Sequence, residues 1–350
     1  MTATSVSSLV VPQPLRSRSL SRLHLAGVAV GSVGVTALLF ALTPLAGRAD
    51  FLVAAAVVYG TAQTVVSVLV EGRRQAASRL LGLLVRAAVL AALVPLLLVL
   101  GYTVVRGAPH LSVNFLTHSM RGVGPLNPGG GIYHAIVGTL EQVLLASLLA
   151  VPLGLLAAVY VTEYGVGRLA TAVRFVTDVM TGVPSIVSGL FILAFWVIGL
   201  HRGFSGFAGA LALAILMLPV VIRSAEEMIK LVPDALREAS YALGIPRWRT
   251  IVSVVLPTAS AGITTGVMLA VARVTGETAP LLLTTFGLDA INTDPFHGQQ
   301  SALPLYIFGQ ATSSAVGAVD RAWAAALTLI VLVLGLYVLA RLVTRRNRLV

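Results

Sequence analysis

Residues 223–257, RSAEEMIKLVPDALREASYALGIPRWRTIVSVVLP, form a charged stretch between two long apolar runs and decide the fold of this chain. Proline is favoured at the first position of a helix, and glycine is favoured directly after the last position. The proline and the glycine of this stretch therefore predict a short helix over 233–243 that ends at Gly244. A second helix is expected to start near Arg247 and to continue into the apolar run that follows.

The predicted short helix has an apolar face beside charged residues. Its apolar residues recur at helical spacing and flank one basic and one acidic side chain: Leu236, Ala239, Ala242 and Leu243, with Arg237 and Glu238. A short amphipathic helix on the inner face of a membrane protein is suited to bind in a groove of a partner protein. The same composition also fits a helix that lies on lipid headgroups, so both interpretations stay open.

The chain as a whole is too apolar for a soluble globular protein. Of its 350 residues, 57% are hydrophobic and 11% are charged, against about 25% charged in an average soluble domain. A helix needs roughly 20 residues to cross a bilayer. Eight runs without a charge or a histidine reach 19–23 residues: 25–47, 51–70, 87–105, 142–162, 179–200, 203–222, 250–272 and 322–340. The sequence therefore predicts an all-α integral membrane protein with eight transmembrane helices.

The distribution of charge predicts how these helices are oriented. The formal net charge is +11. If the N-terminus is cytoplasmic, 18 of the 24 basic residues fall in cytoplasmic segments, as the positive-inside rule requires. Both termini are therefore expected in the cytoplasm. No basic stripe is interleaved with aromatic residues, so the excess charge does not indicate nucleic-acid binding.

One internal boundary is expected, after Arg79. Residues 1–24 are polar and basic, but the apolar run that follows is 23 residues long, beyond the about 7–15 apolar residues of a signal peptide. This run is expected to be an uncleaved anchor, and the first two helices, joined only by 48–50, are expected to form a scaffold hairpin. Residues 1–79 are thus predicted to be an N-terminal tail with a two-helix extension, and residues 80–350 a six-helix domain.

Several kinds of site are excluded by composition. The chain has no cysteine, which excludes disulfides, thiol catalysis and cysteine-based metal sites. Its six histidines show no repeated metal-ligand spacing, so no metal site is expected. A nucleotide-binding P-loop needs Gly-Lys-Ser/Thr, whereas the single lysine, Lys230, follows Ile229. ATP, if it is used, is therefore expected on another subunit, and the glycines 129–131 are interpreted as a flexible connection.

Within the charged stretch, one pattern resembles a known family. Glu238-Ala239-Ser240, three residues, Gly244, nine residues and then VVLP at 254–257 are similar to the EAA loop of type I ABC importer permeases. Ser and Val stand where that family often has Ala and Ile. In the family, this loop forms a coupling helix that binds in a cleft of the cytoplasmic ATPase. The resemblance therefore implies a coupling loop at about 233–257 whose ATPase-contacting residues are Glu238, Ala239, Ser240 and Gly244.

Three further stretches narrow the resemblance to the phosphate-specific permeases of this family. They are 130–140 (GGIYHAIVGTL), 182–190 (GVPSIVSGL) and 276–282 (GETAPLL). The Thr-Ala-Pro after Gly-Glu in the last stretch resembles the PstA-type subunit more than its PstC-type partner. The similarity spans about 80–344, the six-helix core, and the first two helices depart from the usual six-helix pattern.

The resemblance implies a permease subunit of an ATP-driven phosphate importer in a bacterial cell membrane, and not an enzyme. The implied partners are a PstC-like second permease, a dimer of PstB-like ATPases and an extracytoplasmic PstS-like phosphate-binding protein. ATP and magnesium are expected on the ATPase, with no cofactor in this chain, and a permease homodimer stays open. One rival interpretation is a sulfate or molybdate permease. Another is an intramembrane lipid-linked transferase, which needs an acidic or histidine cluster at the interface that no loop here concentrates.

Charge inside the membrane indicates where function lies, because an ionised group at the bilayer centre costs at least about 2.5–3.5 kcal/mol. Arg273 and Glu277 are four residues apart and can pair on one helix face. Gly276 between them and Pro280 beyond predict a bent or broken helix. The pair is either a structural ion pair or a site where the arginine meets an anion, and the resemblance favours the second. Arg223 matches a basic position on the family's anion route, or it is a positive-inside anchor.

Other polar residues are assigned structural roles. Glu141 and Gln142 are expected to hydrogen-bond to another helix. Asp178 is expected to pair with Arg174, four residues before it. The outer loop 286–321 carries an apolar stretch and is expected to lie along the outer surface under a solute-binding protein.

Overall fold

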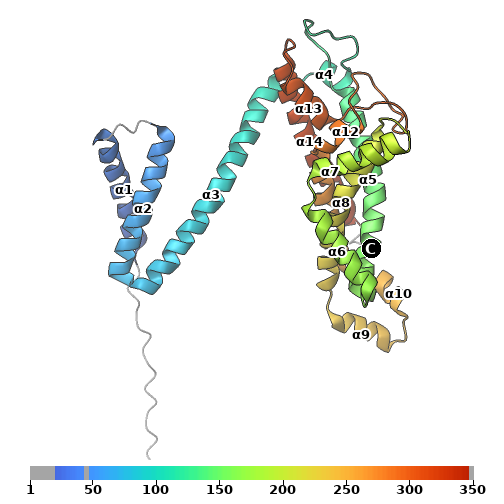
Figure 1. Cartoon of the computed structure of the whole chain (residues 1–350). Coiled ribbons are helices and arrows are strands. Elements are labelled where there is room, and N and C mark those ends of the chain that lie inside the picture. Colours follow the sequence, from blue (N-terminus) through green and yellow to red (C-terminus); the bar gives the residue numbers. More distant parts are fainter. Residues whose placement is uncertain (1–19, 43–46, 347–350) are drawn as a thin grey trace, which may run out of the picture. The chain divides into compact units, whose positions relative to one another are not determined.

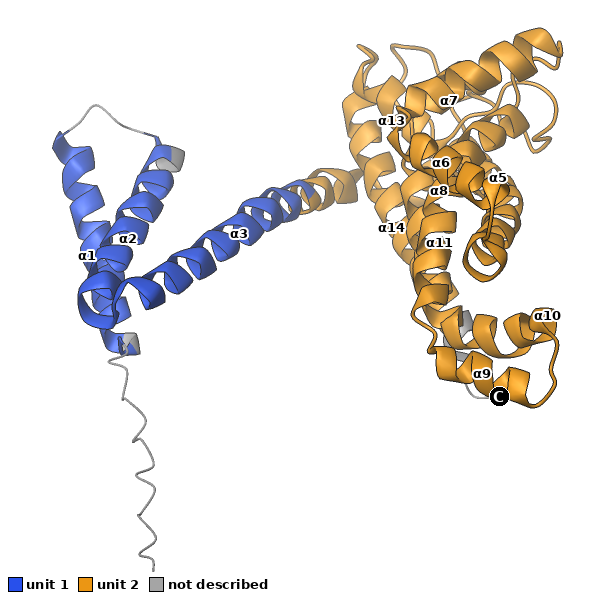
Figure 2. Cartoon of the chain, turned by 60° about the horizontal axis from the view of Figure 1, so that its bottom comes forward, with its two compact units in different colours: residues 1–99 blue, residues 100–350 orange. Residues whose placement is uncertain are grey.

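The computed structural model describes residues 20–42 and 47–346. Within them the chain is helical, and the β-structure is one isolated bridge between Phe286 and Gln300. This confirms the all-α class that the composition predicts. The chain divides into two compact units, residues 1–99 and residues 100–350 (Figure 2).

The first unit contains a helical hairpin. Helices α1 (Arg22–Leu42) and α2 (Arg48–Glu71) pack against each other (Figure 1), and α3 (Arg73–Gly107) begins directly after α2. The predicted connection at 48–50 is wrong, because these residues already belong to α2. The helix α1 is described from Arg22 to Leu42, and residues 43–46 of the predicted run lie outside the described residues.

A carboxylate fixes the turn between α2 and α3. Glu71 accepts hydrogen bonds from Nη2 of Arg79 (2.6 Å), from the hydroxyl of Ser67 (2.7 Å) and from the backbone N–H of Leu20 (2.5 Å). Gly72 forms the turn itself with φ +91°, a conformation that glycine adopts without steric cost. The boundary expected after residue 79 lies inside α3 and stays a prediction.

The second unit is a bundle built around two long helices. Helix α5 (Tyr133–Val159) packs along α8 (Gly206–Lys230), and α8 packs in turn on α11 (Leu256–Thr275). Small residues let membrane helices approach closely: a Cβ on Gly154 of α5 would lie 2.7 Å from a methyl carbon of Val221 on α8. The core of the bundle is formed by small and branched apolar side chains, among them Ala146, Ala150, Leu213, Met217, Ala270 and Val274.

The remaining elements surround this bundle. Helix α14 (Ala318–Arg346) packs on α11 and on α13. The shorter elements are η1 (Ala108–His110), α4 (Val113–Thr117), α6 (Arg168–Gly182), α7 (Ser185–Ile192), α9 (Asp234–Ala242), α10 (Arg247–Thr250), α12 (Ala279–Thr284) and α13 (Leu303–Ala311), with π-helical turns η2 (Tyr160–Tyr164), η3 (Leu193–Gly199) and η4 (Ile251–Val255).

The eight predicted spans correspond to seven continuous helices and one broken helix. Seven helices of the described chain are long and apolar enough to cross a membrane. The expectation of one helix over 179–200 is wrong, because the chain bends by 107° between α6 and the helical segment 185–199. Val183 adopts ψ 127° at this bend, as expected for the residue that precedes a proline, here Pro184. When this bent pair is counted as one span, the candidate spans number eight in the described chain.

The outer loop is packed into the bundle. The expectation that its apolar stretch lies along the outer surface is wrong for the start of α13, where Leu303 and Tyr306 are buried together with Phe115 and Ile132. These side chains cover the beginning of α5 and lose their contact with water, which is favourable for apolar groups. Phe308 is the part of this stretch that stays exposed.

The predicted short helix of the charged stretch is confirmed. Helix α9 begins at Asp234, so Pro233 precedes the helix instead of occupying its first position. Gly244 has φ +76°, the left-handed conformation expected for a glycine that ends a helix. The second helix starts at Arg247 as predicted and continues through η4 into α11. Helices α9 and α10 lie at one end of the second unit, and α4 and α13 lie at the other (Figure 1).

Candidate functional site

Arg273 and Glu277 lie where the seventh span breaks. Helix α11 ends two residues after Arg273, Gly276 follows outside it, and α12 begins at Ala279. The Nε atom of the arginine lies 3.9 Å from Oε1 of the glutamate, and the two side chains are 58% and 20% exposed. No other group in the described chain hydrogen-bonds to this guanidinium. The sequence therefore predicted both the break and the pairing, and the pair is a loose one.

The packing of α11 on α8 shows how deep Arg273 lies along the bundle. A Cβ on Gly262 would meet Met228, and a Cβ on Gly266 would meet Ser224, so the two helices run antiparallel. Extending this register by seven residues, about 10 Å of helix, places Arg273 level with residue 217, near the middle of α8. Arg273 is therefore near the end of its own helix α11 but level with the middle of the neighbouring helix α8.

Arg223 belongs to a separate cluster of charges near the C-terminal end of α8. Its guanidinium contacts the carboxylate of Asp178 and lies 3.5 Å from Glu226, which also binds Lys230 at 2.7 Å. The predicted pairing of Asp178 with Arg174 is wrong. Arg174 instead donates a hydrogen bond to a backbone carbonyl at the end of α5. Among the described residues, no ion pair joins this cluster to the Arg273–Glu277 pair.

The coupling loop exposes three of the four residues that its motif predicts, and Ser240 is the exception. Glu238 and Ala239 are exposed on α9, whereas Ser240 is buried and shares a 2.8 Å hydrogen bond with the hydroxyl of Thr250 on α10. The serine therefore joins the two short helices, while its two neighbours face outward. Large apolar side chains are exposed beside them: Leu231, Leu236, Tyr241, Leu243 and Trp248. Several exposed large apolar side chains on one short segment are typical of a site for a partner.

A polar contact in the N-terminal half of α5 involves a loop residue that the sequence did not single out. The Nε2 atom of Gln142 donates to Oε1 of Gln300 (2.9 Å) and to the carbonyl of Ser301 (3.2 Å), and Gln300 donates to Glu141 (2.5 Å). The predicted hydrogen bonding is confirmed, but its partner is a loop and not another helix. One residue type in the sequence is consistent with this contact. Position 206 is a glycine, and a Cβ there would collide with the side chain of Gln300.

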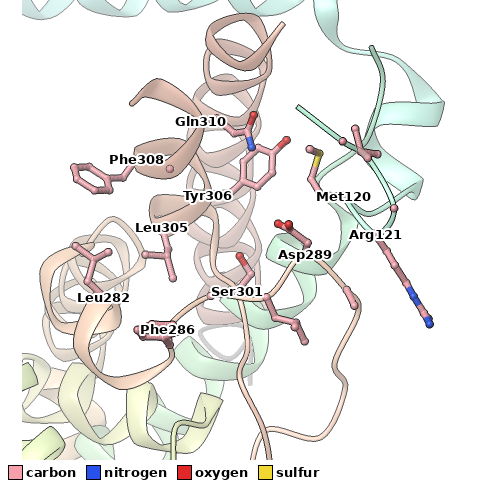
Figure 3. A pocket seen from close by; sticks show the side chains of 17 residues that line it. Met120, Arg121, Leu282, Phe286, Asp289, Ser301, Leu305, Tyr306, Phe308 and Gln310 are labelled. Carbon is pink, nitrogen blue, oxygen red and sulfur yellow. The ribbon is translucent and has the colours of Figure 1, made fainter. Parts of the chain in front are cut away.

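A pocket of about 960 Å³ opens beside this loop (Figure 3). Tyr306 projects into it next to Met120 and above Asp289. Burial raises the pKa of Tyr306 to about 12, and its hydroxyl has no hydrogen-bond partner in the described chain. Within residues 20–42 and 47–346, no three His, Asp or Glu side chains lie close enough to hold a metal ion.

Comparisons with known proteins agree with this geometry. Residues 150–349 match the family model described as the binding-protein-dependent transport system inner membrane component. The chain is 49% identical over 263 residues to phosphate transport system permease protein PstA 1 of Mycobacterium tuberculosis, covering 74% of this chain and 85% of the relative. It is 41% identical over 254 residues to phosphate transport system permease protein PstA of Yersinia pestis, covering 72% and 85%.

A solved structure shares the fold. The MetNI methionine ABC transporter in inward-facing conformations superposes with a TM-score of 0.50 at 18% identity, covering 67% of this chain and 99% of that chain. At this identity, the likeness concerns the fold alone.

Proposed function

This chain belongs to the PstA family of phosphate transport system permease proteins, and on this premise we propose how it conducts phosphate and couples that movement to ATP. It is a multi-pass inner-membrane permease subunit of an ABC importer and not an enzyme, since the ATPase of such importers is a separate subunit. A sulfate or molybdate permease and a lipid-linked transferase are not favoured, because the curated relatives are phosphate permeases.

Arg273 is the residue we assign to the phosphate path. The observation that carries this assignment is a half-exposed guanidinium midway along the bundle whose single carboxylate partner is 3.9 Å away. A charge at such a depth is costly unless it faces a water-filled path or a tight partner. The partner is not tight, which supports the water-filled path. The break after α11 also frees backbone at this level, as is tolerated in membranes where the chain lines a cavity.

The chemistry of the substrate fits this arrangement. Phosphate at neutral pH carries roughly one to two negative charges, and a guanidinium offers it a rigid fork of N–H donors. In the empty path, Glu277 holds the guanidinium in place. When the anion arrives, it takes over the donors of Arg273 and repels the glutamate. Arg223, nearer the end of α8, is assigned the next contact along the path, where the anion competes with Asp178 and Glu226.

The coupling loop is assigned the contact with the ATPase. Glu238 and Ala239 face outward on α9 and the apolar side chains beside them are unpartnered in this chain, as a helix that binds in a groove requires. Gly244 sets the direction of the chain after α9. The partners we assign are a PstC-like second permease, two PstB-like ATPases that hold ATP and magnesium, and an extracytoplasmic PstS-like phosphate-binding protein.

Both termini and the coupling loop are assigned to the cytoplasm. The chain has no cysteine, so single cysteines can report its orientation. Leu126→Cys, His297→Cys and Leu243→Cys replace side chains that are 83%, 85% and 79% exposed. An impermeant maleimide added to intact cells is expected to label the first two positions only. Labelling at position 243 would reverse the orientation.

The function is tested with the assembled importer. The tagged chain is purified with its partners, which mass spectrometry identifies, and is reconstituted in liposomes that contain ATP and receive the binding protein outside. Radiolabelled phosphate is expected to accumulate, and a tenfold excess of sulfate or molybdate is expected to leave its uptake unchanged. Accumulation of radiolabelled sulfate at the rate of phosphate would contradict the proposal.

A further inference from the structure

The C-terminal end of α5 is held by three arginines that come from three other elements. Arg174 of α6 donates from Nη2 to the carbonyl of Val161 (2.9 Å). Arg237 of α9 donates from Nη2 and Nε to Oε1 of Glu163 (2.9 and 3.2 Å). Arg247 of α10 donates to the backbone carbonyl of Glu163. We call residues 161–164, with these three arginines, the α5 joint.

The local structure explains why arginines gather at this point. The last carbonyls of a helix have no partner within it, and they carry the negative end of the helix dipole. Here α5 ends in the wider turn η2, and Gly165 leaves this turn where a Cβ would collide with the carbonyl of Val161. Arginine side chains satisfy such carbonyls and complement the dipole. The guanidinium of Arg247 also lies 4.9 Å from the ring centroid of Tyr164, within the range of a cation–π contact.

The ion pair at the centre of the joint is more enclosed than the other ion pair described for the coupling loop, Arg237 with Asp234. The side chains of Glu163 and Arg237 are 5% and 13% exposed. Arg237 also donates to the carbonyls of Ile229 (3.0 Å) and Val232 (2.6 Å). One guanidinium thus joins α5, the end of α8 and α9. Its donors are all used in fixed directions, which a planar fork permits and a lysine does not.

Helix α5 extends from this joint to the outer loop. Glu163 and Gln142 are 21 residues apart, about 30 Å of helix. At that distance Gln142 binds Gln300 and Ser301 of the segment that precedes α13. The residues between pack along the whole length of α8. A displacement applied at the joint therefore reaches the outer loop through one continuous, closely packed helix.

We propose that the α5 joint is the connection through which movement of the coupling helix α9 is transmitted to α5, and that Glu163 and Arg237 are its positioning residues. This inference rests on the proposed docking of the ATPase at α9. The ATPase displaces α9, the enclosed ion pair carries the displacement to the end of α5, and α5 moves the contact of Gln142 with the outer loop. Phosphate passage is thereby linked to ATP hydrolysis. Neither residue contacts phosphate or ATP in this account.

The test uses variants that keep the size of the side chains. Glu163→Gln removes the charge of the acid, and Arg237→Lys removes the fork of donors. Asp234→Asn is the matched control, because Asp234 also bonds Arg237 (3.0 Å), but its side chain is 88% exposed. Each variant is purified as the full importer and reconstituted with the binding protein. Three quantities are measured: the amount of ATPase that co-purifies, the rate of ADP release, and the uptake of radiolabelled phosphate.

The ratio of phosphate taken up to ADP released distinguishes transmission from a merely structural role. For Glu163→Gln and Arg237→Lys, we expect the ATPase to co-purify at the level of the unmodified chain and the ratio to fall at least fivefold. Asp234→Asn is expected to keep the ratio within twofold. Glu163→Asp, which keeps the charge on a shorter side chain, is expected to recover part of the ratio lost in Glu163→Gln.

Two results would overturn the proposal. One is a ratio within twofold of the unmodified chain in both Glu163→Gln and Arg237→Lys. The other is loss of the ATPase from both variants and from Glu163→Asp, which would show that the pair only maintains the folded loop. Failure of the unmodified importer to take up phosphate would count against the proposed function and not against the joint, because the comparison is made only between importers that transport.

Discussion

Two arginine–glutamate pairs in this chain differ in almost every physical respect. Arg273 and Glu277 are four residues apart, 3.9 Å from each other, and the arginine side chain is 58% exposed. Arg237 and Glu163 are 74 residues apart in the sequence, 2.9 Å from each other and enclosed by the ends of three helices. The first pair lies at a helix break midway along the bundle, and the second fastens the coupling loop.

The difference separates an arginine that is available to a ligand from one that is committed to the fold. An exposed ion pair contributes about 0–1 kcal/mol to stability, so little free energy holds Arg273 to Glu277 when an anion competes for it. Removing one partner of a buried pair costs about 3–5 kcal/mol, because the remaining charge is left without compensation. The same two residue types therefore form a binding element in one place and a structural connection in the other.

The largest effect on stability is expected at the enclosed pair. Arg237→Ala leaves the carboxylate of Glu163 buried without its cation, and the subunit should lose about 3–5 kcal/mol of stability. Immunoblots of membranes should show a strongly reduced amount of the chain. Arg273→Ala is the matched comparison and should retain most of the protein. Equal amounts of the two variants would remove the distinction between the pairs.

A smaller effect is expected at the end of the coupling helix. Gly244 has φ +76°, which costs a residue with a Cβ about 1–2 kcal/mol, and more when the side chain is β-branched. Gly244→Val should therefore insert into the membrane but lose ATP-driven phosphate uptake, as the direction of α9 changes. Gly335→Ala is the control, since a Cβ there meets nothing within 4 Å. Uptake at the unmodified rate by Gly244→Val would remove the docking role from α9.

The smallest effect is expected at the charged cluster of Arg223. Asp178 and Arg223 are 57% and 41% exposed, so their contact contributes about 0–1 kcal/mol. Asp178→Asn should leave the thermal stability of the detergent-solubilised subunit unchanged and alter the Km for phosphate by at most about fivefold. A loss of stability comparable to that of Arg237→Ala would place Arg223 among the structural arginines.

The contrast between the two pairs also explains what the sequence could predict. The Arg273–Glu277 pair was found because its members are four residues apart in an uncharged run. The pair of Arg237 and Glu163 was missed because 74 residues separate them and nothing local marks either as buried. The bend at Pro184 was missed for a different reason: it follows from the effect of a proline on the preceding residue, which the length of an uncharged run does not reveal.

Packing decided the other outcomes. Gln300 lies in a loop and binds Gln142 across 158 residues, and its one local sign, the glycine at 206, does not reveal which side chain that glycine accommodates. The apolar start of α13 looked like a surface segment, yet it covers the beginning of α5. The helix α9 and the turn at Gly244 were predicted well, because proline and glycine act on their own backbone.

The assignment of Arg273 to the phosphate path is tested most directly by the uptake of radiolabelled phosphate, measured beside immunoblots of the same membranes. The variants compared are Arg273→Gln, Arg273→Lys and a double variant that combines Arg273→Gln with Glu277→Gln. Hydrogen bonds to a charged group are worth about 1.5–3 kcal/mol, so Arg273→Gln should lower uptake about 10- to 150-fold while the ATPase still co-purifies. Arg273→Lys should be severely impaired, since it lacks the fork. The double variant also lacks the carboxylate of Glu277, so its amount should be at least that of Arg273→Gln while its uptake stays as low. Uptake by the double variant close to that of the unmodified chain would show that the pair is structural, and the anion route would then have to run elsewhere, first past Arg223.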